Sequence, residues 1–283
     1  MEFNLNGSKP VIALLGAGSM GCAIVKRIGA GKTILLGDIS EKNLEARATE
    51  LRTGGYIVET QRVDACDSVS IRDFAEKAAA LGPVKYFIDT AGASPNQATP
   101  EQIIRLDLIG TAAALDEFAK VIANGGAGLV ISSQTGYMMP FTPDVEQQLA
   151  MTPTDRLAAL PFLQNEAAVN SGTAYITAKR ANHMRVRAAA ATTWGDARAR
   201  INTISPGVVV TPLAYDEFNA AGDAYQKMIA ASPARRVGTS EEIAAAGAFL
   251  LSEEASFITG TDLLIDGGVI AAIQTGRYIL NVQ

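Results

Sequence analysis

Short apolar runs alternate with longer segments of helical period along the chain, and this alternation restricts the fold more than any other feature. The runs, rich in Val, Ile and Leu, are Val11–Leu15, Thr33–Leu36, Tyr56–Val63, Val84–Ile88, Leu129–Ser132, Arg200–Ile204 and Leu263–Ile265. The helical segments are Gly21–Ile28, Glu41–Thr53, Ser68–Leu81, Thr99–Ile122, Ala174–Trp194 and Ser240–Leu251. Continuous apolar strands between helices are typical of a parallel sheet covered on both faces. We therefore expect a doubly wound α/β fold with right-handed crossovers.

Two segments interrupt the alternation. Residues 136–172 contain four prolines and many apolar side chains, and residues 211–233 directly follow a strand. Long insertions in compact domains are often lids or binding loops. Ligands of open α/β sheets bind beyond the carboxyl ends of the strands. We expect a lid-like insertion at about 136–172, a substrate loop at about 211–233, and one domain spanning residues 1–283.

Composition excludes several classes of function. The net charge of −5 argues against nucleic-acid binding, and no apolar run reaches the ~18 residues of a membrane span. Cys22 and Cys66 form no CxxC pair, which fits a reducing compartment. Met1–Pro10 lacks the order of a signal peptide, so we expect a cytoplasmic protein. His183 is the single histidine, so we expect no metal and a structural or interface role for that residue.

A glycine-rich turn, Gly16-Ala17-Gly18-Ser19-Met20-Gly21, follows the first strand and opens a helix. Such glycines permit a tight turn, close approach of the backbone to a pyrophosphate, and close helix–strand packing. The free N–H groups of the helix then face the phosphates. Asp38 ends the second strand, where it could accept hydrogen bonds from ribose hydroxyls or serve only as a turn or capping residue. Its carboxylate would repel a 2′-phosphate, which favours NAD(H) over NADP(H).

Tyr175 and Lys179 are four residues apart, which places them on one face of a helix. A free tyrosine has a pKa of about 10 and is a poor acid–base group at neutral pH. A nearby cation lowers that pKa and makes the phenol useful for proton transfer. An isolated pair of this kind could also be an ordinary exposed pair on an amphipathic helix.

Together these motifs resemble the short-chain dehydrogenase/reductase family, and the resemblance covers nearly the whole chain. The turn, Asp38, the serines Ser132-Ser133, the Tyr175/Lys179 pair and the Pro206-Gly207 turn occur in the family's order. The resemblance implies a single-domain, Rossmann-type oxidoreductase. It also implies that Ser133 and Tyr175 bind the substrate oxygen and that Tyr175 transfers the proton, with Ser132 as the alternative to Ser133. Lys179 would bind the nicotinamide ribose and lower the tyrosine pKa.

The resemblance also implies a cofactor site and a position for a relay residue. The implied cofactor residues are Gly16, Gly18, Ser19, Met20, Gly21, Asp38, Asp64, Ala65, Ala91, Gly92, Tyr175, Lys179, Pro206, Val209 and Thr211. Asp107 stands where the family has an asparagine that holds a water leading from the lysine to solvent. A carboxylate there could hold the water and add a charge, or Asp107 could be an ordinary helix residue.

Three other features depart from the family pattern. The turn reads GxGxxG and lacks the usual threonine, and Asp89-Thr90 replaces a pair of asparagines. The third is the insertion between Ser133 and Tyr175. Its apolar residues could line a substrate pocket, pack against the domain or contact another subunit: Met138, Met139, Pro140, Phe141, Leu157, Leu160, Pro161, Phe162 and Leu163.

We therefore expect an enzyme that transfers a hydride between NAD(H) and a small-molecule ketone or secondary alcohol, largely apolar, and that forms a homotetramer or homodimer. Two other functions are compatible with the motifs. A dinucleotide-sensing regulator would keep the fold without the chemistry. A sugar-nucleotide epimerase or dehydratase shares the Tyr/Lys pair but usually has a longer C-terminal substrate region.

Overall fold

The computed structural model describes residues 8–211 and 225–279. Seven parallel strands form one sheet in the order β3-β2-β1-β4-β5-β6-β9. They are β1 (Val11–Leu15), β2 (Thr33–Asp38), β3 (Ile57–Arg62), β4 (Val84–Asp89), β5 (Ile122–Ile131), β6 (Arg200–Pro206) and β9 (Asp262–Ile265). A second, two-stranded sheet pairs β7 (Val209–Val210) with β8 (Gly238–Thr239). The doubly wound parallel architecture predicted from the apolar runs is confirmed.

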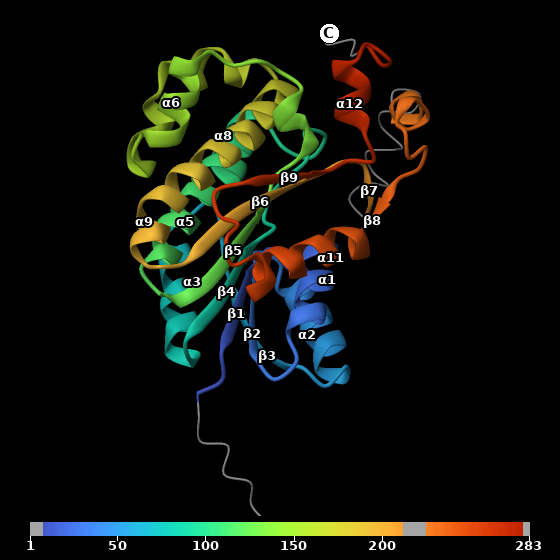
Figure 1. The fold of residues 1–283 in the computed structure, drawn as a ribbon. Coiled ribbons are helices and arrows are strands. Elements are labelled where there is room, and N and C mark those ends of the chain that lie inside the picture. The colour runs from blue at the N-terminus through green and yellow to red at the C-terminus, as the bar shows by residue number, and fades with distance from the viewer. Residues whose placement is uncertain (1–7, 212–224, 280–283) are drawn as a thin grey trace, which may run out of the picture.

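Helices cover both faces of the large sheet (Figure 1). One face carries α1 (Ser19–Ile28), α2 (Glu41–Thr53) and α11 (Ser240–Leu251), and the other carries α3 (Ser68–Leu81), α5 (Thr111–Ala119) and α8 (Ser171–Ala191). The remaining described helices are α4 (Pro100–Ile103), α6 (Pro143–Met151), α7 (Pro161–Asn165), α9 (Thr193–Asp196), α12 (Val269–Gln274) and one at 225–231. Because both faces are covered, every residue of β1 is buried.

The order of the strands reverses direction between β1 and β4, which are neighbours in the sheet although two strands and three helices separate them in the chain. Successive connections leave these two strands toward opposite edges of the sheet, which opens a crevice beyond their carboxyl ends. The glycine-rich turn follows β1 at this point, and Thr90 follows β4. The Thr90 hydroxyl donates a hydrogen bond to the carbonyl of Gly16 at 2.5 Å, which joins the two strand ends.

Several predicted bounds differ from the structure, and two of the differences are large. The helix expected over Thr99–Ile122 is divided into α4, a π-helical segment η1 (Ile104–Gly110) and α5. The strand expected from Leu129 already begins at Ile122, where Ile122 pairs with Val84 of β4. Gly125 and Gly126 interrupt the apolar pattern in the first half of β5. That half is therefore recognisable as a strand only from its pairing with the neighbouring strands.

The insertion is a folded part of the domain rather than an irregular loop. Two of its prolines begin helices, since Pro143 starts α6 after the capping residue Thr142 and Pro161 starts α7. Proline suits the first helical position because its missing N–H would have no partner there. The leucine side chains of the insertion are buried in one cluster with alanines of α8: Leu149, Leu157, Leu163, Ala174, Ala178 and Ala181.

Across residues 8–211 and 225–279, no helix combines the length and the apolar character that crossing a bilayer requires.

Candidate active site

Lys179 and Asp107 form a buried ion pair in the crevice. The Lys179 Nζ atom lies 2.7 Å from Asp107 Oδ1, and the two side chains are 5% and 0% exposed. Burial alone would lower the pKa of Lys179, but the Asp107 carboxylate, aided by Tyr175, outweighs it and raises that pKa above its usual value. The lysine is therefore an ammonium at neutral pH.

Besides its ion pair with Lys179, the Asp107 side chain has a backbone hydrogen bond and a close packing contact with Gly92. Its Oδ2 atom accepts a hydrogen bond from the Ala93 backbone N–H at 3.1 Å. It lies in η1, and π-helical segments of this kind are frequent at functional sites because they change which side chains face inward. A β-carbon on Gly92 would lie 2.5 Å from Asp107 Oδ1, so only glycine fits between that carboxylate and the lysine.

Tyr175 and Lys179 share the inner face of α8, as their spacing predicts. The Lys179 ammonium lies 5.2 Å from the centroid of the Tyr175 ring. Both residues line a cavity of about 200 Å³ together with Ser133, Asp107 and Thr211. A phenol and an ammonium therefore face one cavity, an arrangement that can transfer a proton.

Ser132 and Ser133 differ in what their hydroxyls contact. Ser132 Oγ donates to the Lys179 backbone carbonyl at 2.9 Å, which ties the end of β5 to α8. Ser133 Oγ accepts from the Thr135 N–H at 3.2 Å and begins the 3-10 turn η2 (Gln134–Tyr137). Ser132 is thus used within the fold, whereas the Ser133 hydroxyl still has its own hydrogen to donate. This supports Ser133 as the substrate-binding serine.

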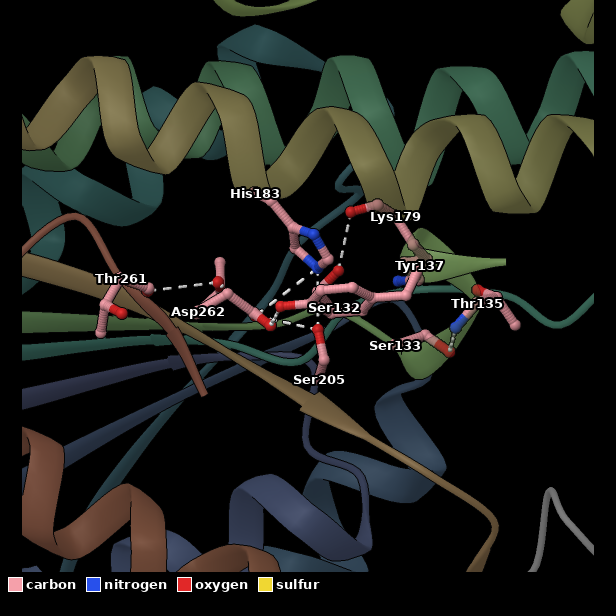
Figure 2. Close-up of polar contacts among 10 residues, drawn as sticks. Ser132, Ser133, Thr135, Tyr137, Lys179, His183, Ser205, Thr261 and Asp262 are labelled. Carbon is pink, nitrogen blue, oxygen red and sulfur yellow. Dashed lines mark hydrogen bonds and ion pairs between the residues drawn. The ribbon is translucent and has the colours of Figure 1, made fainter. Parts of the chain in front are cut away.

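A buried polar network behind this turn fixes its position (Figure 2). Tyr137 OH donates to Asp262 Oδ2 at 2.7 Å, and Ser205 Oγ donates to Asp262 Oδ1 at 2.8 Å. His183 Nε2 lies 2.7 Å from Ser205 Oγ, so the serine accepts from the imidazole while it donates to the carboxylate. Burial lowers the pKa of His183 to about 4 against the opposing effect of Asp262. The imidazole is therefore neutral at pH 7, and its described polar contacts lie within this network.

A second cavity, of about 410 Å³, follows the glycine-rich turn. It and the smaller cavity share the lining residues Met20, Thr90, Ala91, Gly92 and Thr211. A ligand that extends along the turn can therefore reach Tyr175.

The turn itself fits a dinucleotide. Gly16 has a φ of +84°, and a β-carbon on it would lie 2.5 Å from the Ala91 nitrogen, so only glycine permits this close approach of β1 and β4. A β-carbon on Gly18 would have no atom within 4 Å, so the backbone there is open toward a ligand. A β-carbon on Gly21 would lie 2.7 Å from Leu14, so this glycine permits close helix–strand packing.

Asp38 lines this second cavity and braces the turn at the same time. Its Oδ2 atom accepts from the Ala17 N–H and from the Asn43 amide, each at 2.9 Å, and its Oδ1 atom accepts from the Ser40 N–H. Asp38 therefore has the turn role that was considered for it, whereas Ser40 is the residue that caps α2. A carboxylate has about four acceptor positions, so one remains for a ribose hydroxyl.

The structure brings most of the predicted residues to these two cavities. Those lining one or both are Gly16, Gly18, Ser19, Met20, Asp38, Asp64, Ala65, Ala91, Gly92, Asp107, Ser133, Tyr175, Lys179, Pro206, Val209 and Thr211. Gly21 is the exception, because it faces Leu14 and Thr90. The residues 212–224 of the predicted substrate loop lie outside the described residues.

Sequence reasoning missed several cavity residues. Arg47 lines the larger cavity, while Ser94, Gln134 and Thr135 line the smaller one. Gln134 and Thr135 could have been found because they directly follow Ser133 in the chain. Arg47 could not, since it lies two turns into α2 and nothing in its local pattern marks it.

Comparisons with known proteins identify the family of the chain. A model of the enoyl-(acyl carrier protein) reductase family matches residues 141–270. The short-chain dehydrogenase/reductase bsc3 of Alternaria brassicicola is 39% identical over 267 residues, covering 93% of this chain and 97% of the relative. Galactitol 2-dehydrogenase (L-tagatose-forming) of Cereibacter sphaeroides is 27% identical over 277 residues, covering 94% and 96%.

The fold is shared with solved structures as well. A short-chain dehydrogenase/reductase from Serratia marcescens BCRC 10948 superposes with a TM-score of 0.73 at 22% identity, covering 93% of this chain and 98% of the other. The relative with 39% identity spans nearly the whole chain, and the fold agrees throughout. The chain therefore belongs to the short-chain dehydrogenase/reductase family, whose members are oxidoreductases of alcohols and carbonyl compounds.

Proposed function

We propose that the protein transfers a hydride between NAD(H) and a ketone or secondary alcohol, with Ser133, Tyr175, Lys179 and Asp107 as its catalytic group. The observation that carries this proposal is the meeting of Ser133, Tyr175 and Lys179 at one cavity that adjoins the dinucleotide cavity. Bound NAD(H) supplies or accepts the hydride.

Each residue then has a distinct task in carbonyl reduction. Ser133 and Tyr175 donate hydrogen bonds to the carbonyl oxygen, and Tyr175 gives up its proton as the oxygen becomes an alkoxide. The Lys179 ammonium stabilises the resulting tyrosinate and binds the nicotinamide ribose. Asp107 holds that ammonium at 2.7 Å and would hold the water that returns a proton to the site. Alcohol oxidation uses the same groups in reverse.

Replacing Tyr175 tests the proposal directly. Tyr175→Phe removes the transferable proton and keeps the ring, so kcat should fall at least 10³-fold with any carbonyl substrate. The dissociation constant for NADH should change less than threefold, which fluorescence titration measures. Activity retained in the variant would refute the assignment. Tight NADH binding by the wild type without turnover of any carbonyl or alcohol would instead favour the dinucleotide-sensing regulator.

The cofactor is proposed to be NAD(H) because Asp38 places a carboxylate in the cavity that would receive the ribose. Arg47 lines the same cavity and could attract a 2′-phosphate, but its Nη1 atom lies 3.0 Å from Glu50 Oε2. Glu50 also pairs with Lys26, so it offsets only part of the Arg47 charge, whereas Asp38 braces the turn directly and has no cationic partner among the described ion pairs.

Comparing kcat/KM for NADH and NADPH tests this choice. We expect a preference for NADH of at least tenfold, because a 2′-phosphate would be placed near the Asp38 carboxylate. A preference for NADPH would overturn the cofactor assignment and would point to Arg47 as the phosphate-binding residue.

The largely apolar substrate expected from the insertion stays a prediction. None of the nine apolar insertion residues is among the described residues that line the Tyr175 cavity. The names of relatives cover sugar alcohols, such as galactitol and D-threitol, and the carbonyl compound levodione. Substrate polarity therefore has to be inferred from the cavity itself. The homodimer or homotetramer and the cytoplasmic location stay predictions.

A further inference from the structure

Three side-chain oxygens, on residues that line the Tyr175 cavity, have no hydrogen-bond partner among the described residues. They are Ser94 Oγ, Gln134 Oε1 and Thr135 Oγ1, and all three atoms are buried. Their residues line the cavity together with Ser133 and Tyr175, yet the hydride-transfer mechanism assigns none of them a task.

An unpartnered buried polar group destabilises a fold, because its hydrogen bonds to water are lost without replacement. Most such groups in proteins are therefore paired, and an exception calls for a water, an ion or a ligand as the missing partner. Three exceptions at one cavity beside the reacting groups indicate that a bound molecule supplies the missing partners.

Two of these groups, those of Gln134 and Thr135, are carried by η2, whose backbone is held at both ends. At its start the Thr135 N–H donates to Ser133 Oγ, and at its end Tyr137 OH donates to Asp262 at 2.7 Å (Figure 2). Between them, Gly136 packs so closely on α8 that a β-carbon would lie 2.7 Å from His183 Cε1. The backbone that carries Gln134 and Thr135 is thus fixed before any ligand arrives, which reduces the entropy lost on binding.

The present partner of Gln134 is a weak one. Its Nε2 atom donates to Met228 Sδ at 3.6 Å, and a thioether sulfur is a poor acceptor. A ligand oxygen would be a better partner for this amide. Because an amide carries both a donor and an acceptor, Gln134 can serve either a hydroxyl or a carbonyl group.

We propose that the substrate carries a second oxygen group, a hydroxyl or a carbonyl, which Ser94, Gln134 and Thr135 bind while Ser133 and Tyr175 hold the reacting carbonyl. The substrate class is therefore hydroxyketones and diketones, or the corresponding diols in the oxidative direction. This inference rests on the proposed function. Sites built to bind a substrate hydroxyl reject analogues that lack it, because their own polar groups are then left unpaired.

Matched pairs of substrates test the inference at two molecular sizes. Cyclohexanone is compared with 2-, 3- and 4-hydroxycyclohexanone, and 1-tetralone with 4-hydroxy-1-tetralone, by following NADH oxidation. In at least one pair the hydroxylated ketone should have a kcat/KM at least tenfold higher.

Gln134→Met and Thr135→Val should reduce this preference for the hydroxylated ketone at least fivefold. The matched changes Gln164→Met and Thr192→Val, at side chains outside the cavity, should leave the preference unaltered.

Two results would overturn the inference. One is equal kcat/KM for the plain ketone and every hydroxylated partner in the wild type. The other is a Gln134→Met variant, correctly folded by circular dichroism, that loses activity equally toward both members of the preferred pair.

A binding measurement separates this inference from the proposed function. Cyclohexanol and the 1,2-, 1,3- and 1,4-cyclohexanediols are titrated against the enzyme–NADH complex, in which no oxidation can occur. At least one diol should bind at least tenfold more tightly than cyclohexanol. Tighter binding without turnover of any ketone would refute the proposed function alone, whereas Tyr175-dependent turnover with equal binding of all four alcohols would refute the inference alone.

Discussion

At the scale of single residues, the site is unusual in having two buried carboxylates near one lysine. Asp107 bonds to Lys179, whereas Asp89 accepts a hydrogen bond from the Ala91 N–H at 3.0 Å and is 2% exposed. Burial raises the pKa of Asp89 to about 7, although the Ala91 N–H, Lys179 and Thr111 oppose this effect. The ionised form of Asp89 therefore destabilises the folded state relative to its protonated form.

Asp89→Asn should stabilise the protein, and more so at high pH. In the folded state Asp89 binds its proton up to about pH 7, whereas the unfolded chain releases it near pH 4. Since the folded state binds more protons in this window, the free energy of unfolding falls as pH rises from 4 to 7. Asparagine does not ionise, so the substitution removes this loss of stability, and the amide oxygen can still accept the hydrogen bond from the Ala91 N–H. Urea unfolding should show a gain on the order of 2 kcal/mol at pH 8 and a smaller one at pH 5.

The exposed Asp155→Asn serves as the control and should change stability at neither pH. An equal gain from Asp89→Asn at both pH values would show that Asp89 titrates normally in the fold.

The position of a residue in the site was predictable from the sequence only where it depends on residues nearby in the chain. Tyr175 and Lys179 were predictable because their helical spacing alone places them on one face. The pairing of Asp107 with Lys179 was not, since it joins η1 to α8 across 72 positions of the chain. The same limit hid Arg47, whose place in the cofactor cavity follows from how α2 packs.

At the scale of elements, the turn η2 connects Ser133 to the body of the domain. Tyr137 OH reaches Asp262 of β9 through a hydrogen bond of 2.7 Å, and Ser205 of β6 meets the same carboxylate. Hydrogen bonds to charged groups contribute about 1.5–3 kcal/mol, so this contact can set the position of a short turn.

Tyr137→Phe should therefore misplace Ser133 without disturbing the cofactor site. The ring remains, but the bond to Asp262 is lost, so kcat should fall about three- to tenfold while KM for NADH changes less than twofold. Steady-state kinetics measure both constants. Tyr56→Phe removes a hydroxyl that bonds to the Lys26 carbonyl far from the site, and it should leave kcat unchanged. Unaltered kcat in Tyr137→Phe would show that η2 holds its position without this contact.

Among the elements, strands and helices with strong periodicity were predicted well, and interruptions were not. The bounds of α2, α3 and α11 agree with the prediction, because Ser40, Asp67 and Thr239 cap them recognisably. The π-helical segment η1 has no such signal, since the sequence Ile104–Gly110 reads as an ordinary helix. The start of β5 depends on its neighbours β4 and β6 rather than on its own residues.

At the scale of the whole molecule, the parallel sheet and its crevice followed from the alternation of strands and helices, but the insertion's packing did not. The insertion contributes buried leucines to the cluster that contains alanines of α8. Arg185 of α8 also donates to the carbonyls of Leu149 and Thr152, at 3.1 Å and 2.9 Å. The apolar residues of the sequence could not show whether the insertion is a lid or packs permanently on α8, because both arrangements would bury the same side chains.

Truncating Leu157 distinguishes a packed layer from a lid. This leucine is fully buried among insertion and α8 side chains, so Leu157→Ala should lower the free energy of unfolding by about 2–5 kcal/mol. The melting temperature should fall on the order of 5–10 °C in a single transition, because the insertion and the catalytic helix share one apolar cluster. Val169→Ala, at a position 70% exposed in the same insertion, should change it by no more than about 1 °C. If Leu157→Ala instead kept its melting temperature and changed only kcat/KM, the insertion would behave as a lid that opens independently of the domain.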